Sequence, residues 1–244
     1  KSPPISHRTD WPGPMITHTG LALAAVVLDW YLGEPRRWHP LVGFGNLASA
    51  IERLLNRQFN RQPASPALLR LLGLAALLVM LVPVTTIAFL LTRGAPFHSG
   101  ISIGLSLTLL YLALGHRSLH DHAQPVAVAL NNQDDELARH LAGRMVSRDS
   151  EHLEIATAIT ESVLENGNDG VFGALFWFLV AGPTGALLYR LANTLDAMWG
   201  YRNARYKNFG WAAARFDDLM IYIPARLTAL TYALLGKTHL SLNC

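Results

Sequence analysis

Apolar residues gather in five stretches of the chain, and polar segments separate these stretches. The strongest covers 24 residues, with one charge, Arg70, near its start and Pro83 as an expected kink. A helix needs about 20 apolar residues to cross a bilayer, so this stretch is long enough. We therefore predict an all-α, polytopic integral membrane protein in contact with the lipid bilayer. Its apolar segments are 20–32, 68–91, 101–115, 171–189 and 219–236, of which 20–32 and 101–115 are short for a span.

The sequence Ala181-Gly-Pro-Thr-Gly185 interrupts the fourth stretch. The segments 34–67 and 190–218 are both rich in Lys and Arg, and the positive-inside rule places both in the cytoplasm. A full crossing over 171–189 would put 190–218 on the wrong side. We therefore predict a re-entrant helix pair near 171–199, with a turn at 182–185. Ten helical residues rise about 15 Å, half the apolar thickness of a bilayer. An ordinary span with a glycine-proline kink is the alternative.

The remaining organisation is simple. Residues 1–14 are polar and proline-rich, and we interpret them as a flexible leader. Residues 15–244 form a single membrane domain. Polar loops are expected over 34–67, 116–169 and 190–218, and the loop 116–169 should be largely helical and cytoplasmic.

Composition agrees with a membrane protein, because 51% of residues are hydrophobic and only 15% are charged. A formal net charge of +3 without a long basic run argues against nucleic acid as a partner. The single cysteine, Cys244, excludes an internal disulfide and a cysteine-based metal site. The sequence contains neither the P-loop nor the dinucleotide-binding fingerprint, so any nucleotide must bind without those loops.

Acidic residues recur at helical spacing just before the interrupted apolar stretch. Glu151, Glu154, Glu161 and Glu165 share one face of a helix, and Asp169 follows. A solvated acidic face is one interpretation. The other is that Glu161, Glu165 and Asp169 help to hold Mg²⁺ through carboxylate oxygens.

Two further groups of residues suggest chemistry. Arg144 and Arg148 are four apart and suit phosphate binding, or they pair with nearby glutamates on the surface. Asp217 and Asp218 stand at the start of an apolar run. They are either the N-cap of a helix or ligands for a metal or substrate. Arg226 lies inside that run, and we expect it to be buried and paired with one of these aspartates. His116 and His120 are four apart, with His122 nearby, and this spacing allows zinc. No third ligand is evidently placed for it, so we interpret them as ordinary loop histidines.

Several short motifs occur in the order typical of one family. They are Leu28-Asp29, Gly33-Glu34-Pro35, His39-Pro40, Leu114-Gly-His-Arg117, Val146-Ser-Arg148-Asp149, Glu161-Ser-Val-Leu-Glu165-Asn166, Asn193-Thr-Leu-Asp196, Gly200-Tyr201, Arg205-Tyr206, Arg215-Phe-Asp217-Asp218 and Pro224-Ala-Arg226. On these residues the chain resembles the CbiB/CobD-type adenosylcobinamide-phosphate synthases of cobalamin biosynthesis, over roughly 20–236. The family usually has Asp where Glu34 stands and Ala-Pro at residues 173–174. Its members also continue with a further loop and apolar segment, so the chain is expected to be truncated at its C-terminal end.

The resemblance implies ATP-dependent formation of an amide between adenosylcobyric acid and aminopropanol or its phosphate. An amine cannot displace oxide from a carboxylate, because oxide is too poor a leaving group. The carboxylate must therefore first be activated, with Mg²⁺ offsetting phosphate charge. It also implies the bacterial inner membrane, an active site facing the cytoplasm, and contact with other cobalamin-assembly enzymes. The implied catalytic residues are Glu161, Glu165 and Asp196, with Glu161 or Asp196 as base. Metal ligands are Glu165, Asp169 and Asp217 or Asp218. Substrate and phosphate ligands are Arg144, Arg148, Asn166, Asn193, Tyr201, Arg205, Arg215 and Arg226.

Two other functions compete with this interpretation. The chain could be a non-catalytic membrane sensor or regulator, similar to AmpE-type relatives, that keeps the fold without the ligase chemistry. It could also be a small-molecule transporter, because interrupted helices often line transport sites.

Overall fold

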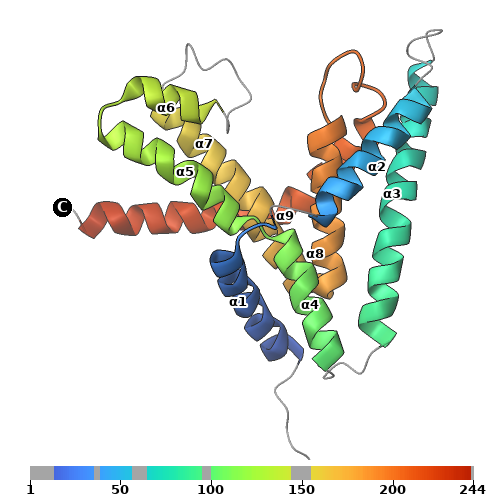
Figure 1. Ribbon diagram of the computed structural model, residues 1–244, viewed down its shortest axis with the longest axis horizontal. Helices are drawn as coiled ribbons and strands as arrows, with labels where there is room; N and C mark the ends of the chain where they lie inside the picture. Colours follow the sequence, from blue (N-terminus) through green and yellow to red (C-terminus); the bar gives the residue numbers. More distant parts are fainter. Residues whose placement is uncertain (1–13, 36–38, 57–64, 95–99, 144–154, 243–244) are drawn as a thin grey trace, which may run out of the picture.

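A computed structural model of the chain describes residues 14–35, 39–56, 65–94, 100–143 and 155–242 (Figure 1). The predicted leader and the Arg144–Arg148 pair lie outside these residues. Within them every regular element is a helix, which confirms the predicted all-α class. The elements are α1 (Pro14–Leu32), α2 (Pro40–Leu55), α3 (Pro66–Gly94), α4 (Gly100–Ala113), α5 (His116–Asn131), α6 (Asp135–Ala142), α7 (Ile155–Gly167), the π-helical η3 (Asn168–Phe172), α8 (Gly173–Trp199) and α9 (Trp211–Leu242).

Three helical stretches in the described part are long and apolar enough to cross a membrane: Pro66–Thr92, Thr157–Trp199 and Trp211–Leu235. A shorter apolar helix covers His18–Leu32. Most of the side chains on α3 point outward, including Leu71, Val79 and Leu90, each more than half exposed. Such faces suit lipid rather than water, and they support the predicted polytopic membrane protein.

The long stretch through α8 reverses direction at Gly182. This glycine has φ 70° and ψ −163°, a backbone region that is essentially restricted to glycine. On either side of the turn, Gly173 meets Tyr189 and Gly185 lies against the Trp177 carbonyl. A straight helix could not bring residues 16 positions apart into contact, since it rises 1.5 Å per residue. The predicted pair of helices with a turn at 182–185 is therefore confirmed as a helical hairpin, and its limbs are 173–181 and 183–199.

Two apolar clusters hold the hairpin in place. One joins the return limb of α8 to α2, α3 and α9 around the buried Trp199 and Phe209, whose rings meet edge to face. The other joins both limbs to α1, α4 and α9 around Phe178, Tyr189 and Leu110. In Figure 1, α8 lies between α2 and α3 on one side and the α5–α6–α7 group on the other. The hairpin is thus the central support of the fold.

The loop 116–169 contains α5, α6 and α7, so its predicted helical character is confirmed for its described residues. These helices share a small core of their own, built around Val126, Ala138 and Ile159. The α7 helix then continues through η3 into α8 without a break. One continuous stretch therefore connects the polar part of the chain to the hairpin.

Two sequence expectations were wrong. The segment 34–67 is not only a polar loop, because α2 packs Ala48 and Ile51 into the core beside α3. The loop expected over 190–218 is also shorter, since α8 runs to Trp199 and α9 begins at Trp211. Asp217 and Asp218 consequently lie inside α9 rather than at its N-cap. The reason in both cases is tertiary packing, which gives polar segments an apolar surface to cover.

Candidate functional site

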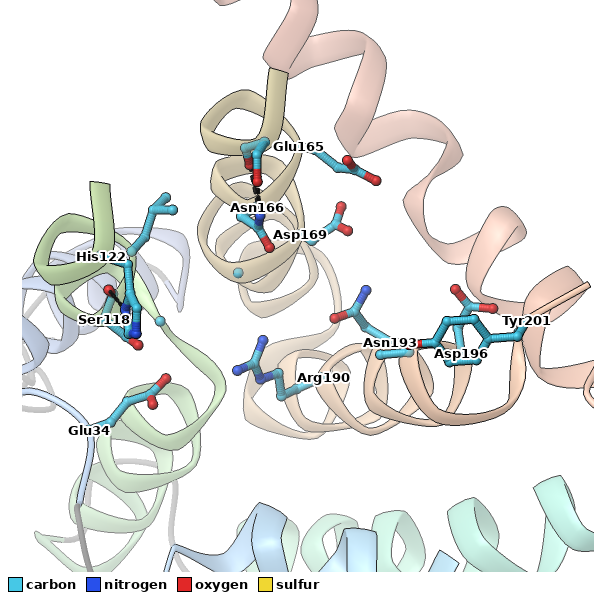
Figure 2. Close-up of a pocket in the computed structure, with 16 residues that line it drawn as sticks. Glu34, Ser118, His122, Glu165, Asn166, Asp169, Arg190, Asn193, Asp196 and Tyr201 are labelled. Atoms are coloured by element: carbon cyan, nitrogen blue, oxygen red, sulfur yellow. Dashed lines mark hydrogen bonds between the residues drawn. The ribbon is translucent and has the colours of Figure 1, made fainter. Parts of the chain in front are cut away.

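A pocket of about 630 Å³ opens where the polar helices meet the return limb of α8 (Figure 2). Its wall comes from four parts of the chain: the end of α1, the start of α5, the α7–η3 junction and the return limb with the turn after it. The lining residues are Glu34, Gly115, Ser118, Leu119, His122, Ser162, Glu165, Asn166, Asp169, Gly170, Arg190, Asn193, Asp196, Ala197, Gly200 and Tyr201. The pocket therefore joins residues that are more than 160 positions apart.

The α7–η3 junction supplies Glu165, Asn166 and Asp169. The Asn166 amide nitrogen donates to the Ser162 carbonyl at 2.8 Å and to its hydroxyl at 3.1 Å. The Asn168 amide donates to the Asp169 carboxylate at 3.1 Å. Single π-helical turns are common at functional sites because they shift the register of the side chains that follow. Here the π-helical turn carries Asp169 into the pocket wall.

The return limb of α8 supplies the opposite wall. Asn193 follows Arg190 by three positions, and Asp196 and Ala197 follow Asn193 by three and four, so they lie on one face of the helix. The Asn193 side chain interacts with both Asp169 and Asp217. Asp217 is buried on α9, and one of its carboxylate oxygens has no hydrogen-bond partner among the described residues. The Asn193 amide therefore links the return limb to the α7–η3 wall through Asp169 and to α9 through Asp217.

The start of α5 is fixed by a buried carboxylate at the end of α1. Asp29 accepts a hydrogen bond from the Arg117 backbone N–H at 2.8 Å, and the Arg117 guanidinium donates to the Trp30 carbonyl at 2.8 Å. His116 and His120 pack against the Trp30 ring. They are helical residues rather than loop histidines, and this packing holds the α5 wall of the pocket.

The pocket is strongly acidic. Four carboxylates, from Glu34, Glu165, Asp169 and Asp196, line it together with one guanidinium, from Arg190. Asp217 lies close enough to interact with Asp169 and Asp196. Such a field favours a cation, either a metal ion or an ammonium group.

The donor set suits Mg²⁺ only in part. Within the described residues, no three His, Cys, Asp or Glu side chains come close enough to hold one metal ion. Mg²⁺ is, however, commonly held by one or two carboxylates together with substrate phosphates. Glu165 and Asp169 lie one helical turn apart on the pocket wall and fit that pattern.

Several predicted site residues lie elsewhere. Glu161 is exposed on α7 and does not line the pocket. Arg205 pairs with the buried Glu52 of α2, with Nε–Oε1 at 3.0 Å. Arg215 is 68% exposed and makes a loose ion pair with Asp218 at 3.5 Å.

The expectation for Arg226 was wrong. Its side chain is exposed rather than buried, donates to the Tyr222 carbonyl at 2.8 Å and stacks on the Tyr222 ring. The aspartates do not pair with it, because an arginine on an outward face can find a partner one turn away on its own helix.

Sequence reasoning missed the pocket residue Arg190, and it used Glu34 only as part of a motif. Ser118, Ser162 and His122 were not selected either. The signal for Arg190 was present, since it is a charged residue within a re-entrant apolar pair, and such residues face cavities or partners.

The fold and site define a class: a helical protein with membrane-type helices and an acidic pocket at the base of a re-entrant hairpin. The family model described as "CobD/Cbib protein" matches residues 22–243. This chain belongs to the CobD/Cbib family.

Similar proteins carry matching names. The chain is 54% identical over 228 residues to "Cobalamin biosynthesis protein CobD" of Chromobacterium violaceum, covering 90% of the chain and 70% of that relative. It is 52% identical over 225 residues to the protein of the same name in Stutzerimonas stutzeri, covering 91% and 71%. It is 40% identical over 220 residues to "Probable cobalamin biosynthesis protein CobD" of Thermococcus kodakarensis, covering 88% and 70%. No solved structure matches the chain.

Proposed function

We propose that this chain acts in cobalamin biosynthesis as an adenosylcobinamide-phosphate synthase. It would join a propionate carboxylate of adenosylcobyric acid to aminopropanol or its phosphate as an amide, with consumption of ATP. The observation that carries the proposal is the acidic pocket with one arginine at the base of the hairpin, in a chain of the CobD/Cbib family. Amide formation needs groups that hold an amine and an anion side by side, and this pocket offers both.

The residues can be given roles. Mg²⁺ and ATP, when bound, supply charge neutralisation and activation of the carboxylate. Glu165 and Asp169 would hold the metal together with the nucleotide phosphates. An attacking amine must be neutral, so a carboxylate has to accept its proton. Asp196 lines the pocket and Glu161 does not, which favours Asp196 as that base.

The pocket volume suits part of the substrate. A volume of about 630 Å³ is typical of sites for small organic ligands. It would hold the reacting propionate arm and the amino alcohol, with the corrin ring outside. Asn166, Asn193 and the exposed Tyr201 would orient these groups at the rim.

We also propose where in the cell the protein and its pocket lie. The Lys- and Arg-rich segments favour the cytoplasmic side of the bacterial inner membrane. The pocket takes Glu34 from one of these segments and residues Arg190 and Tyr201 from the other, so it would face the cytoplasm, where ATP and other enzymes of cobalamin assembly are found.

The test uses the purified protein in nanodiscs. It is incubated with adenosylcobyric acid, Mg-ATP and 1-amino-2-propanol phosphate, and the amide is sought by mass spectrometry. Amide that depends on ATP supports the proposal. Bound corrinoid without amide, from folded protein, would instead favour a non-catalytic relative.

A further inference from the structure

Arg190 is the one Lys or Arg side chain among the described residues that line the pocket. It lies on the return limb of α8 next to the buried Tyr189, within the apolar part of the fold. Its Nε atom is buried and has no hydrogen-bond partner among the described residues. Figure 2 shows its guanidinium extending into the pocket, on the side of Glu34 and His122. A buried guanidinium N–H without a hydrogen-bond partner is costly unless a ligand completes it.

Glu34 faces Arg190 across Gly115. A Cβ atom on Gly115 would lie 3.6 Å from the Glu34 Oε1 atom and 3.8 Å from the Arg190 Nη2 atom. The ion pairs found within 4.0 Å in the described part of the chain do not include Glu34 with Arg190. The two opposite charges are therefore near one another without being in contact. The bare α-carbon of Gly115 keeps the space between them open.

We propose that Glu34 and Arg190 form a subsite for a small zwitterion, an amino-alcohol phosphate. The guanidinium would bind the phosphate through paired N–H donors, and the Glu34 carboxylate would bind the ammonium group. This subsite rests on the proposed function and assigns its second substrate to named residues. It explains why two opposite charges are placed close together and left unpaired.

The charge of the other walls favours a zwitterion over a nucleotide at this position. A nucleotide carries several negative charges and would meet Glu34, Asp169 and Glu165 with one arginine to offset them. A zwitterion is close to neutral, and its positive end meets a carboxylate. The triphosphate would then bind farther along the pocket, where Mg²⁺ can accompany it.

Binding is measured by calorimetry on the full chain in nanodiscs, without ATP. The probes are 1-amino-2-propanol phosphate, 1-amino-2-propanol and inorganic phosphate. Arg190→Gln should weaken binding of the amino-alcohol phosphate at least about tenfold, because charge-assisted hydrogen bonds are lost. It should leave binding of 1-amino-2-propanol unchanged. Glu34→Gln should weaken binding of both the amino-alcohol phosphate and 1-amino-2-propanol. Inorganic phosphate should compete with the amino-alcohol phosphate only when Arg190 is present.

Gly115→Ala provides a second variant that keeps both charges. Gly115 has φ −138°, which alanine adopts freely, and its new methyl group would be in ordinary contact with its neighbours. The variant should fold normally and still lose affinity, because the methyl group fills the space between the charges. Arg53→Gln, on the exposed face of α2 and away from the pocket, is the matched control and should bind as the unchanged chain does.

Three results would overturn the subsite. They are no binding of the amino-alcohol phosphate by the unchanged chain, equal binding of it by Arg190→Gln, or, in a separate titration with Mg-ATP, an Arg190→Gln defect confined to Mg-ATP. Failure of the proposed function looks different. In that case the amino-alcohol phosphate binds in an Arg190-dependent manner, and no amide forms from adenosylcobyric acid.

Discussion

The ring of Tyr189 lies directly against the α-carbon of Gly173, where the two limbs of the α8 hairpin face each other. A Cβ atom on Gly173 would overlap the Tyr189 ring and approach its Cε1 atom to 2.6 Å. Tyr189 is fully buried and adjoins Arg190, so it cannot move away without shifting the pocket wall. In this chain, with Tyr189 on the facing limb, the close approach of the two limbs therefore depends on the absence of a side chain at position 173.

Gly173→Ala should accordingly destabilise the hairpin. Overfilling a packed core costs about 1–3 kcal/mol, and the pocket should lose substrate affinity as well. The measurement is the thermal unfolding midpoint in detergent together with amide formation. Gly104→Ala on α4 is the control, because its new methyl group would meet nothing within 4 Å. Equal loss in both variants would contradict this account.

Glu165→Gln tests the metal role. The side chain is exposed on the pocket wall, so the fold should survive its neutralisation. Turnover should fall at least about 100-fold, as it does when a group that stabilises developing charge is removed. Amide formation across a Mg²⁺ titration checks this, with Glu136→Gln on the exposed face of α6 as the control. Near-normal turnover at every Mg²⁺ concentration would refute the metal role.

Arg205→Gln tests whether Arg205 is a structural residue. Glu52 is buried and is held by Arg205 and by the Asn56 amide at 2.7 Å. Loss of the arginine leaves a buried carboxylate with one partner. The unfolding midpoint should drop by about 2–6 °C, since 1 kcal/mol corresponds to a few degrees in a chain of this size.

The double variant Glu52→Gln/Arg205→Gln should recover part of that loss, because no charge is then left buried. If the pair instead served phosphate binding, Arg205→Gln would raise the KM for ATP at an unchanged midpoint.

His39 should make stability depend on pH. Its Nδ1 atom accepts the Leu41 N–H at 3.2 Å and caps α2, so the imidazole must be neutral. Burial lowers the pKa of His39 below its ordinary 6.5, and Arg190 adds to this while Glu34 opposes it. The cap is therefore intact above the unfolded pKa. Its contribution declines as pH falls below about 6.5, because the unfolded chain is protonated first.

The check compares unfolding midpoints at pH 7.5 and 5.5 in the unchanged chain and in His39→Asn. Asparagine accepts the same hydrogen bond without titrating, so this variant should lose less stability on acidification. His140→Asn, exposed on α6, should behave like the unchanged chain. Identical pH profiles for all three would refute the cap model.

The sequence predicted the hairpin because its determinants are local. Gly182 and Pro183 break an apolar run, and the charge of the flanking segments requires a return. The helix α2 was missed although Leu41, Phe44, Ala48, Ile51 and Leu55 recur at intervals of three and four. The polar residues around them, and the arginines at both ends, hid the pattern.

The site was only partly predictable for a different reason. Glu165, Asp169, Asn193 and Asp196 were selected from short motifs, and all four line one pocket. Which arginine joins them depends on how α8 packs against α1 and α5. Spacing along the chain carries no information about that contact. The position of Arg190 inside the re-entrant apolar pair is the one sequence signal that separates it from Arg205, and only the structure shows that it lines the pocket.

The unbroken passage from α7 through η3 into the hairpin has a consequence for how this protein can be divided. Glu165 and Asp169 precede the hairpin, while Arg190, Asn193 and Asp196 belong to its return limb. A water-soluble fragment cut before α8 would keep one wall of the pocket and lose the other. The apolar helices are therefore part of the site itself, and an unrelated membrane anchor could not replace them.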